Sequence, residues 1–246
     1  MIEEAYNQER GVVQHISSLV HNQRSASYAY QFTQEWPAAG IANQLSYTMT
    51  FLRADASSGA GIGDTRLNYR YQLAGDGFGK VAIAPRLTSI LPTGDYRKGR
   101  GAGALGVEAW LPVSVVLTSQ LVAHGNVGLT LTPHARNTDG AHATTQTWTS
   151  GGSLIWLARP TFNILVETIL QRVENVSRED RVVRESSAIV SPGLRWAYNF
   201  PSGLQIVPGL AVPLGVGRTA GERSVLVYLS FEHPFTRSAT AKASAQ

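Results

Sequence analysis

The stretch AIVSPGLRWAYNF, residues 188–200, decides the fold class. Every second residue in it is apolar or aromatic, and the residues between them are mostly small or polar. The apolar set is Ala188, Val190, Pro192, Leu194, Trp196, Tyr198 and Phe200. A period of two places alternate side chains on opposite faces of a β-strand, whereas helical spacing would spread them around a cylinder. We therefore predict a strand with one apolar face and one wet face.

The same alternation recurs along the chain, for example at Leu45, Tyr47, Met49 and Phe51, at Leu67, Tyr69 and Tyr71, and at Val225, Val227 and Leu229. Such runs predict strands at 11–23, 25–36, 41–53, 63–73, 80–91, 104–112, 118–131, 145–157, 161–174, 185–200, 204–214 and 224–235. Their number is even, as bacterial single-chain membrane barrels require. The prediction is an all-β fold, a transmembrane antiparallel up-and-down β-barrel of about twelve strands.

The predicted connections alternate in length. Those at 37–40, 74–79, 158–160 and 201–203 are brief, and those at 54–62, 92–103, 132–144, 175–184 and 215–223 are longer and mostly polar. Short periplasmic turns and long extracellular loops are typical of outer-membrane barrels. The predicted organisation is an N-terminal extension at 1–10, a barrel at 11–235 and a polar tail at 236–246. The first residues, MIEEAYNQERG, do not form a signal peptide.

Composition excludes several other classes. The 246 residues are 43% hydrophobic, and none of their apolar runs approaches the roughly 18 residues that a membrane helix requires. Cysteine is absent, which excludes disulfides and thiolate metal sites. The net charge of +4 comes from scattered basic residues, so we do not expect nucleic-acid binding. Aromatic residues at segment ends are predicted to form membrane-interface girdles, although they could also be core aromatics of a sandwich: Trp36, Trp110, Trp148, Trp156, Trp196 and Phe235.

If the apolar faces meet lipid, the opposite faces enclose a lumen rich in charge. The residues expected there are Glu35, Asp64, Arg66, Arg70, Arg86, Glu108, Glu167, Arg195 and Glu232. A dry interior would make so many charges costly, whereas water and cross-strand pairing remove most of that cost. We expect an acid–base ladder from Asp64, Arg66 and Arg70 through Arg86 to Glu108. Two roles are open for it: a rigid barrel wall, or a path that selects solutes.

No motif in the sequence indicates catalysis. Gly101, Gly103 and Gly106 match G-x-G-x-x-G, but a strand follows where a dinucleotide site needs a helix. The six histidines lack metal-ligand spacing, and His124 is expected to face the lumen. G-x-S-x-G is absent, and a histidine and a serine cannot be placed together on a lipid-facing surface from the sequence. We therefore expect no catalytic residue, no metal and no cofactor.

Several segments resemble a known family. They are IEEAYNQERGVVQH at 2–15, FTQEWP at 32–37, GIGDTRLNYRYQL at 61–73, APRLTSILPTGDYRKGRGAG at 84–103, LPVS at 111–114 and FEHPF at 231–235. Together they resemble the outer-membrane β-barrel family labelled "MetA-pathway of phenol degradation". The resemblance implies a transporter of small, often aromatic or hydrophobic, compounds in the bacterial outer membrane. Phe235 stands where the barrel-assembly machinery would recognise a terminal aromatic residue.

These observations predict an outer-membrane pore or transporter for small solutes, with a polar, charged lumen. The alternatives are a structural or adhesive barrel that binds an external partner through its long loops, and a soluble ligand-binding barrel. The expected partners are outer-membrane lipid, lipopolysaccharide and a small-molecule solute. Arg97, Lys98, Arg100 and the run 178–185 are either contacts to lipopolysaccharide phosphates or solvated loop charge.

Overall fold

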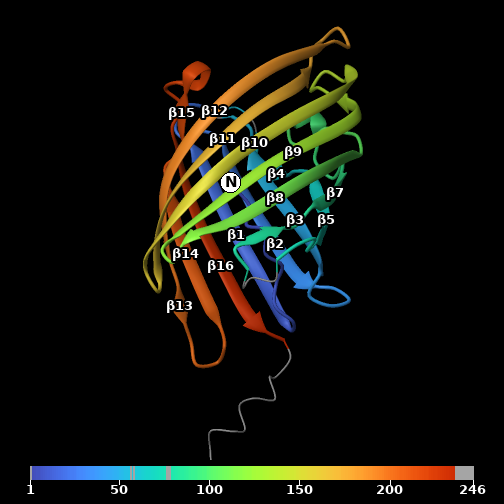
Figure 1. Cartoon of the computed structure of the whole chain (residues 1–246). Coiled ribbons are helices and arrows are strands. Elements are labelled where there is room, and N and C mark those ends of the chain that lie inside the picture. The colour runs from blue at the N-terminus through green and yellow to red at the C-terminus, as the bar shows by residue number, and fades with distance from the viewer. Residues whose placement is uncertain (1, 56, 58, 76–78, 236–246) are drawn as a thin grey trace, which may run out of the picture.

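The computed structural model describes residues 2–55, 57, 59–75 and 79–235, and it forms one closed antiparallel β-barrel of twelve spans (Figure 1). The strand segments are β1 (Val12–Asn22), β2 (Tyr28–Pro37), β3 (Asn43–Arg53), β4 (Gly61–Ile62), β5 (Thr65–Tyr71), β6 (Val81–Ile83), β7 (Arg86–Leu91), β8 (Gly106–Thr118), β9 (Leu121–Arg136), β10 (His142–Arg159), β11 (Phe162–Val176), β12 (Val182–Trp196), β13 (Tyr198–Asn199), β14 (Gln205–Ala211), β15 (Leu214–Val216) and β16 (Ser224–Pro234). Two short 3-10 helices, η1 (Tyr96–Lys98) and η2 (Gly217–Thr219), lie in connections. In this part of the chain, no helix is long and apolar enough to cross a membrane.

Neighbouring spans follow chain order, and β1 closes the barrel by pairing with β16 from Val12↔Pro234 to Asn22↔Ser224. We call the rim where β1 begins and β16 ends the lower rim, and the opposite one the upper rim (Figure 1). Two spans are interrupted beside a proline. β6 and β7 both pair with β8 but separate at Pro85, and β14 and β15 separate at Pro213. Proline breaks a strand because it has no amide hydrogen for the ladder.

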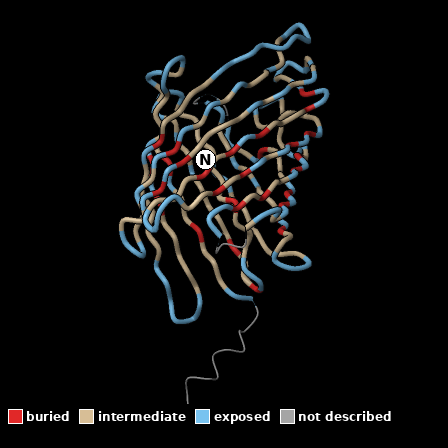
Figure 2. Tube along the Cα trace, in the orientation of Figure 1, coloured by how far each residue is buried: buried red, intermediate tan, exposed pale blue. Residues whose placement is uncertain are grey.

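The apolar faces point outward, as predicted. On β5, Leu67 and Tyr69 are 48% and 42% exposed, whereas the alternate residues Asn68 and Arg70 are 5% and 7% exposed. Exposed and buried positions alternate in the same way along neighbouring spans (Figure 2). An apolar exterior around a polar interior is the arrangement of a transmembrane barrel, which excludes the soluble alternative.

Tryptophans mark the edges of the outward apolar band on β10. Trp148 and Trp156 share the outer face, and each is 50% exposed. At roughly 3.3 Å per residue their eight-residue separation is about 26 Å along a tilted strand. With the tilt of about 35–45° that is usual for such strands, this length covers roughly 20 Å of height, which fits within the apolar band of about 25 Å between the aromatic girdles. We therefore place the upper membrane interface at the level of Trp148.

The prediction for Trp110 was wrong, because this residue faces the lumen. It shares the inner face of β8 with Glu108, and its Nε1 donates to Asn126 Oδ1 at 3.2 Å. Its ring covers Gly128 on β9, where an added Cβ would lie only 1.6 Å from a ring carbon. The guanidinium of Arg86 lies 5.9 Å from the ring centroid on the lumen side. Glu108 and Trp110 are two residues apart in β8, so their side chains point to the same face, and Glu108 faces the lumen. The direction of the Trp110 side chain therefore follows from this alternation, although the residue lies near the end of a predicted strand.

Two predicted loops, 132–144 and 175–184, are strand over at least half of their length. β9 extends to Arg136 and β10 resumes at His142, and β11 and β12 leave only residues 177–181 as a turn. β10 has 18 residues, whereas a membrane strand needs about 9–11. The wall formed by β9–β12 therefore rises above the rest of the barrel (Figure 1). Sequence patterning missed these extensions because water wets both faces there and removes the apolar period.

Candidate functional site

The first residues of the chain lie inside the barrel. Residues 2–10, which we call the N-terminal strap, precede β1 at the lower rim and bond to inward-facing side chains of the wall, so they lie in the lumen. Gly11, with φ of 76°, lies between the strap and β1. A positive φ favours glycine, so this residue allows the chain to turn sharply from the wall into the interior. The sequence predicted only an N-terminal extension here and did not place it in the lumen.

Side-chain oxygens of the inner wall accept hydrogen bonds from the main-chain amides of the strap. The five bonds run from Ile2 N to Glu167 Oε1 at 3.0 Å, Glu3 N to Asn126 Oδ1 at 2.6 Å, Ala5 N to Ser114 Oγ at 2.8 Å, Asn7 N to Gln72 Oε1 at 2.9 Å, and Gln8 N to Gln44 Oε1 at 2.7 Å. The acceptors come from β11, β9, β8, the residue after β5, and β3. The strap is therefore attached to widely separated parts of the wall and crosses the lumen.

Arg70 is the main side chain that grips the strap from β5. Its Nε donates to Asn7 Oδ1 at 3.0 Å, and its Nη2 donates to the carbonyl of Tyr6 at 2.7 Å. Glu35 on β2 lies 3.8 Å from the same guanidinium. Because a buried guanidinium needs acceptors for its N–H groups, the strap supplies part of the hydrogen bonding that Arg70 requires inside the barrel.

Glu108 joins two arginines from two other spans. Its Oε2 accepts from Arg66 Nη1 at 2.8 Å and from Thr130 Oγ1 at 2.9 Å, and its Oε1 accepts from Arg86 Nη2 at 2.7 Å. Arg86 also binds the carboxylate of Glu3 in the strap. Of the expected ladder, the contacts of Arg66 and Arg86 with Glu108 therefore exist across β5, β7 and β8, whereas Arg70 and Asp64 bind other partners. The ladder continues into the strap, which the sequence did not indicate.

The remaining predicted lumen residues surround the other parts of the strap. Arg195 on β12 binds Glu4 at 2.7 Å, and Glu167 holds the amide of Ile2. Glu232 on β16 accepts a hydrogen bond from Gln14 on β1. These side chains all face inward, as predicted. Most of them bind the strap or the wall, so their role as a solute path remains a prediction.

Asp64 lies off the strand face on which the sequence placed it, because β5 begins one residue later. Its two carboxylate oxygens accept the amides of Gly94 and Ala102 at 3.0 and 2.8 Å, which ties the long connection 92–105 to the upper rim. Arg100 in the same connection donates to the carbonyl of Ala60 at 2.7 Å. Arg97 and Lys98 stay exposed. The GIGD and LPTGD motifs therefore form one folded loop.

Small residues make room for the strap, and sequence analysis missed them. Gly151 on the inner face of β10 has the Ile2 side chain so close that an added Cβ would lie 2.7 Å from its Cδ1. Ala5 is fully buried against Ala82 and Ala84 beside the break between β6 and β7. The only signal in the sequence was that small residues occupy these inward-facing positions. That signal could not be interpreted before the structure showed that the strap fills the lumen.

Two histidine environments bear on the question of catalysis. His124 faces the lumen, as expected, and its Nδ1 lies 2.7 Å from Ser114 Oγ. On the outer wall, the structure places His15 and Ser17 on the same face of β1, which the sequence analysis did not foresee. Their polar atoms turn elsewhere: His15 Nε2 lies 3.2 Å from His233 Nε2, and Ser17 Oγ lies 3.1 Å from the hydroxyl of Tyr30. His15 and Ser17 therefore do not form a nucleophile–base pair on the outer wall.

Acidification should loosen the strap through Glu4. Burial favours its neutral form, but Arg195, followed by His124 and Arg70, outweighs burial and holds the pKa of Glu4 below its usual value. The ion pair with Arg195 is therefore complete above the ordinary glutamate pKa of about 4.3 and is lost as the pH falls through the lowered value. We expect current fluctuations in planar bilayers to increase below about pH 4.

The Glu4→Gln variant should show these fluctuations already at neutral pH, because glutamine carries no charge for Arg195. Glu179→Gln, in an exposed upper-rim turn, is the matched control and should behave like the parent. Identical pH profiles for Glu4→Gln and the parent would contradict a role for the Glu4–Arg195 pair in holding the strap.

Solved outer-membrane barrels share this architecture. An outer-membrane channel from Pseudomonas putida F1 aligns with a TM-score of 0.69 at 12% identity, over 95% of this chain and 98% of that one. The NanC porin aligns with a TM-score of 0.61 at 12% identity over 88% and 98% of the two chains, and the KdgM porin with 0.51 at 10% over 89% and 98%. No family model and no curated protein matches the sequence. The class defined by these comparisons is the twelve-stranded transmembrane β-barrel.

Proposed function

We propose that this protein is an outer-membrane channel for small solutes whose lumen is occupied by its own N-terminal strap. The observation that carries the proposal is the way in which the strap is held. Polar and charged side chains bind it singly, and it adds no strand to the barrel wall. Such contacts can break one by one in a hydrated lumen, whereas removal of a wall strand would open the barrel.

The proposed orientation places the upper rim outside the cell and the lower rim in the periplasm. The lower-rim turn at 119–120 and that at 160–161 are short, whereas the upper rim carries the connections 54–60 and 92–105 and the raised β9–β12 wall. This asymmetry is the usual one for outer-membrane barrels. The likeness to porins and channels supports the same location.

The solute class is proposed from two sources. The inner wall offers arginine and glutamate side chains, which suit polar or amphipathic compounds. The resemblance of GIGD, LPTGD and the flanking segments to the "MetA-pathway of phenol degradation" family favours small aromatic or hydrophobic compounds. An amphipathic aromatic compound, such as a substituted phenol, satisfies both.

Reconstitution tests the proposed channel directly. Protein folded into planar bilayers should show discrete conductance steps, and proteoliposomes should take up a substituted phenol faster than protein-free vesicles. Heat-inactivated protein in the same lipid is the control. Conductance and uptake equal to those of protein-free membranes would remove the channel function.

The second candidate function is adhesion, and the raised wall favours it. The two turns at its top are joined by Arg178 Nε, which binds Asp139 Oδ2 at 3.0 Å, and by His142, whose amide donates to Asp180 at 2.7 Å. These cross-hairpin contacts present a defined surface above the membrane. Replacing residues 137–141 and 177–181 with Gly-Ser linkers of equal length should abolish cell-surface binding and spare conductance if the protein acts as an adhesin.

A further inference from the structure

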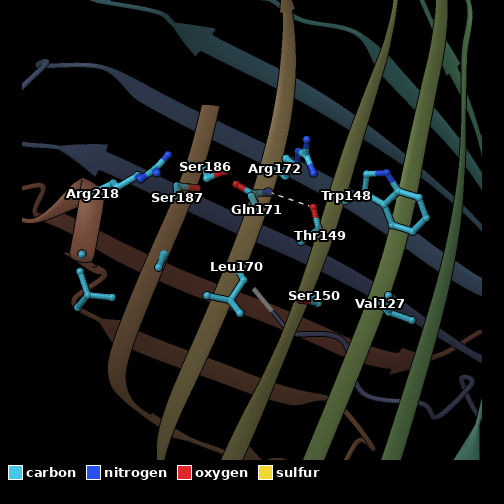
Figure 3. Close-up of a pocket in the computed structure, with 13 residues that line it drawn as sticks. Val127, Trp148, Thr149, Ser150, Leu170, Gln171, Arg172, Ser186, Ser187 and Arg218 are labelled. Atoms are coloured by element: carbon cyan, nitrogen blue, oxygen red, sulfur yellow. Dashed lines mark hydrogen bonds between the residues drawn. The ribbon is translucent and has the colours of Figure 1, made fainter. Parts of the chain in front are cut away.

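The outer wall carries a groove below the upper rim, on the side away from the lumen. It encloses about 490 Å³ between β10, β11, β12 and η2 (Figure 3). Its apolar part is formed by Val127, Leu170, Ala188 and Val216. Arg218 lies at one end of the row of side chains above Leu170, and Trp148 lies at the other (Figure 3).

A step in the barrel wall creates the hollow. The pairing of β12 with β15 ends at Ala188↔Val216, and within the described chain the upper part of β12, residues 182–187, pairs only with β11. The helix η2 packs beside this unpaired edge, where Thr219 Oγ1 donates to the carbonyl of Ala188 at 2.7 Å. The exterior of a barrel is normally convex, so this step is what gives the wall a concave site.

Charge at the top of the groove is positive. Arg172 and Arg218 are exposed, and neither forms a salt bridge with any residue that the structure describes. Two acidic residues on adjoining upper-rim segments already have arginine partners outside the groove. Glu174 binds Arg184 at 2.8 Å, and Glu222 binds Arg24 at 3.1 Å. Glu174 attracts Arg172 electrostatically, but its hydrogen bond comes from Arg184, so both guanidinium groups keep their hydrogen-bond donors available for an anion.

The depth of the groove identifies the kind of anion. Arg172 is the direct cross-strand partner of Trp148, so it lies at the membrane interface marked by that tryptophan. Leu170, Ala188 and Val216 lie on the membrane side of this level, where acyl chains pass. Arginine forks match phosphate oxygens, and an apolar groove beneath them matches a chain attached to that phosphate.

We propose that this groove binds lipopolysaccharide, with a lipid A phosphate held between Arg172 and Arg218 and an acyl chain lying over Leu170. The assignment rests on the proposed outward orientation of the upper rim, because lipopolysaccharide occupies the outer leaflet. It differs from the loop contacts considered from the sequence at Arg97, Lys98, Arg100 and 178–185. The groove lies in the barrel wall and can bind both the phosphate and the acyl chain of the lipid.

Native mass spectrometry of the full chain in detergent tests the proposal, with purified bisphosphorylated lipid A as the probe. The Arg172→Gln/Arg218→Gln variant should bind it at least about tenfold more weakly, because it loses two charge-assisted contacts to phosphate. Arg178→Gln/Arg181→Gln removes the same charge from the run 178–185, which the sequence offered as another phosphate contact, and it should retain binding if the groove is the site.

A second pair of variants tests the apolar part. Leu170→Glu should also weaken binding about tenfold, whereas Leu154→Glu, on the same outer face but outside the groove, should not. Equal binding by the double arginine variant and the parent would overturn the proposal. So would equal binding of dephosphorylated lipid A, or binding of phosphatidylglycerol as tight as that of lipid A. Heat-modifiable gel migration verifies that each variant is folded, and channel conductance, which does not involve the groove, separates this result from the proposed function.

Discussion

Deletion of residues 2–10 is expected to raise the single-channel conductance of the barrel severalfold. The strap crosses the lumen from β3 to β11, and it neutralises arginines that would otherwise attract water and anions. Its removal leaves Arg70, Arg86 and Arg195 facing an open, hydrated path, so the enlarged pore should also become more anion-selective. Single-channel recording and reversal potentials in a salt gradient measure both effects.

The wall should survive this deletion, because β1 begins at Val12 and keeps its full pairing with β16 and β2. A variant that keeps the strap length but replaces residues 2–10 with a Gly-Ser sequence is the matched control, and it should conduct nearly as well as the deletion. A synthetic peptide of residues 2–10, added from the periplasmic side, should restore the block. Unchanged conductance in the deletion would mean that the strap does not limit passage.

Glu108→Gln is expected to destabilise the barrel by about 3 kcal/mol, the lower part of the range for breaking a buried ion pair. Glu108 is buried and accepts hydrogen bonds from Arg66, Arg86 and Thr130, so the amide leaves two guanidinium groups without their shared anion. The lower part of the range applies because Arg66 is partly hydrated. Urea unfolding in lipid vesicles, followed by tryptophan fluorescence, gives the free energy.

Glu222→Gln provides the comparison, since it breaks an exposed ion pair with Arg24 and should change stability by no more than about 1 kcal/mol. The double variant Glu108→Gln/Arg86→Gln should lose less than the sum of the two single changes, because the two residues share one network. Equal stability of Glu108→Gln and Glu222→Gln would show that water in the lumen screens the Glu108 cluster completely.

Parts of the lumen could be predicted because parity along a strand is a local property. Arg66 and Arg70 alternate with Leu67 and Tyr69. If the apolar pair faces lipid, the two arginines must therefore face the lumen. The pairing of Glu108 with Arg86 could also be predicted, because successive spans of an up-and-down barrel lie side by side. Asp64 and Trp110 were misplaced for two different reasons. Asp64 precedes the first residue of β5, so the alternation of that strand does not apply to it. Trp110 lies two residues after Glu108 in β8, so the same alternation already placed it in the lumen, against its interpretation as an interface residue.

The sequence by itself determined the fold class and the direction of the apolar faces, because a period of two is a geometric property of every strand and needs no distant partner. Only the tertiary structure decided what fills the barrel. The strap is held by single contacts between residues as far apart as Ile2 and Glu167, separated by 165 positions. Such contacts leave no periodic trace in the chain, because each depends on the closure of the barrel that brings the two residues together.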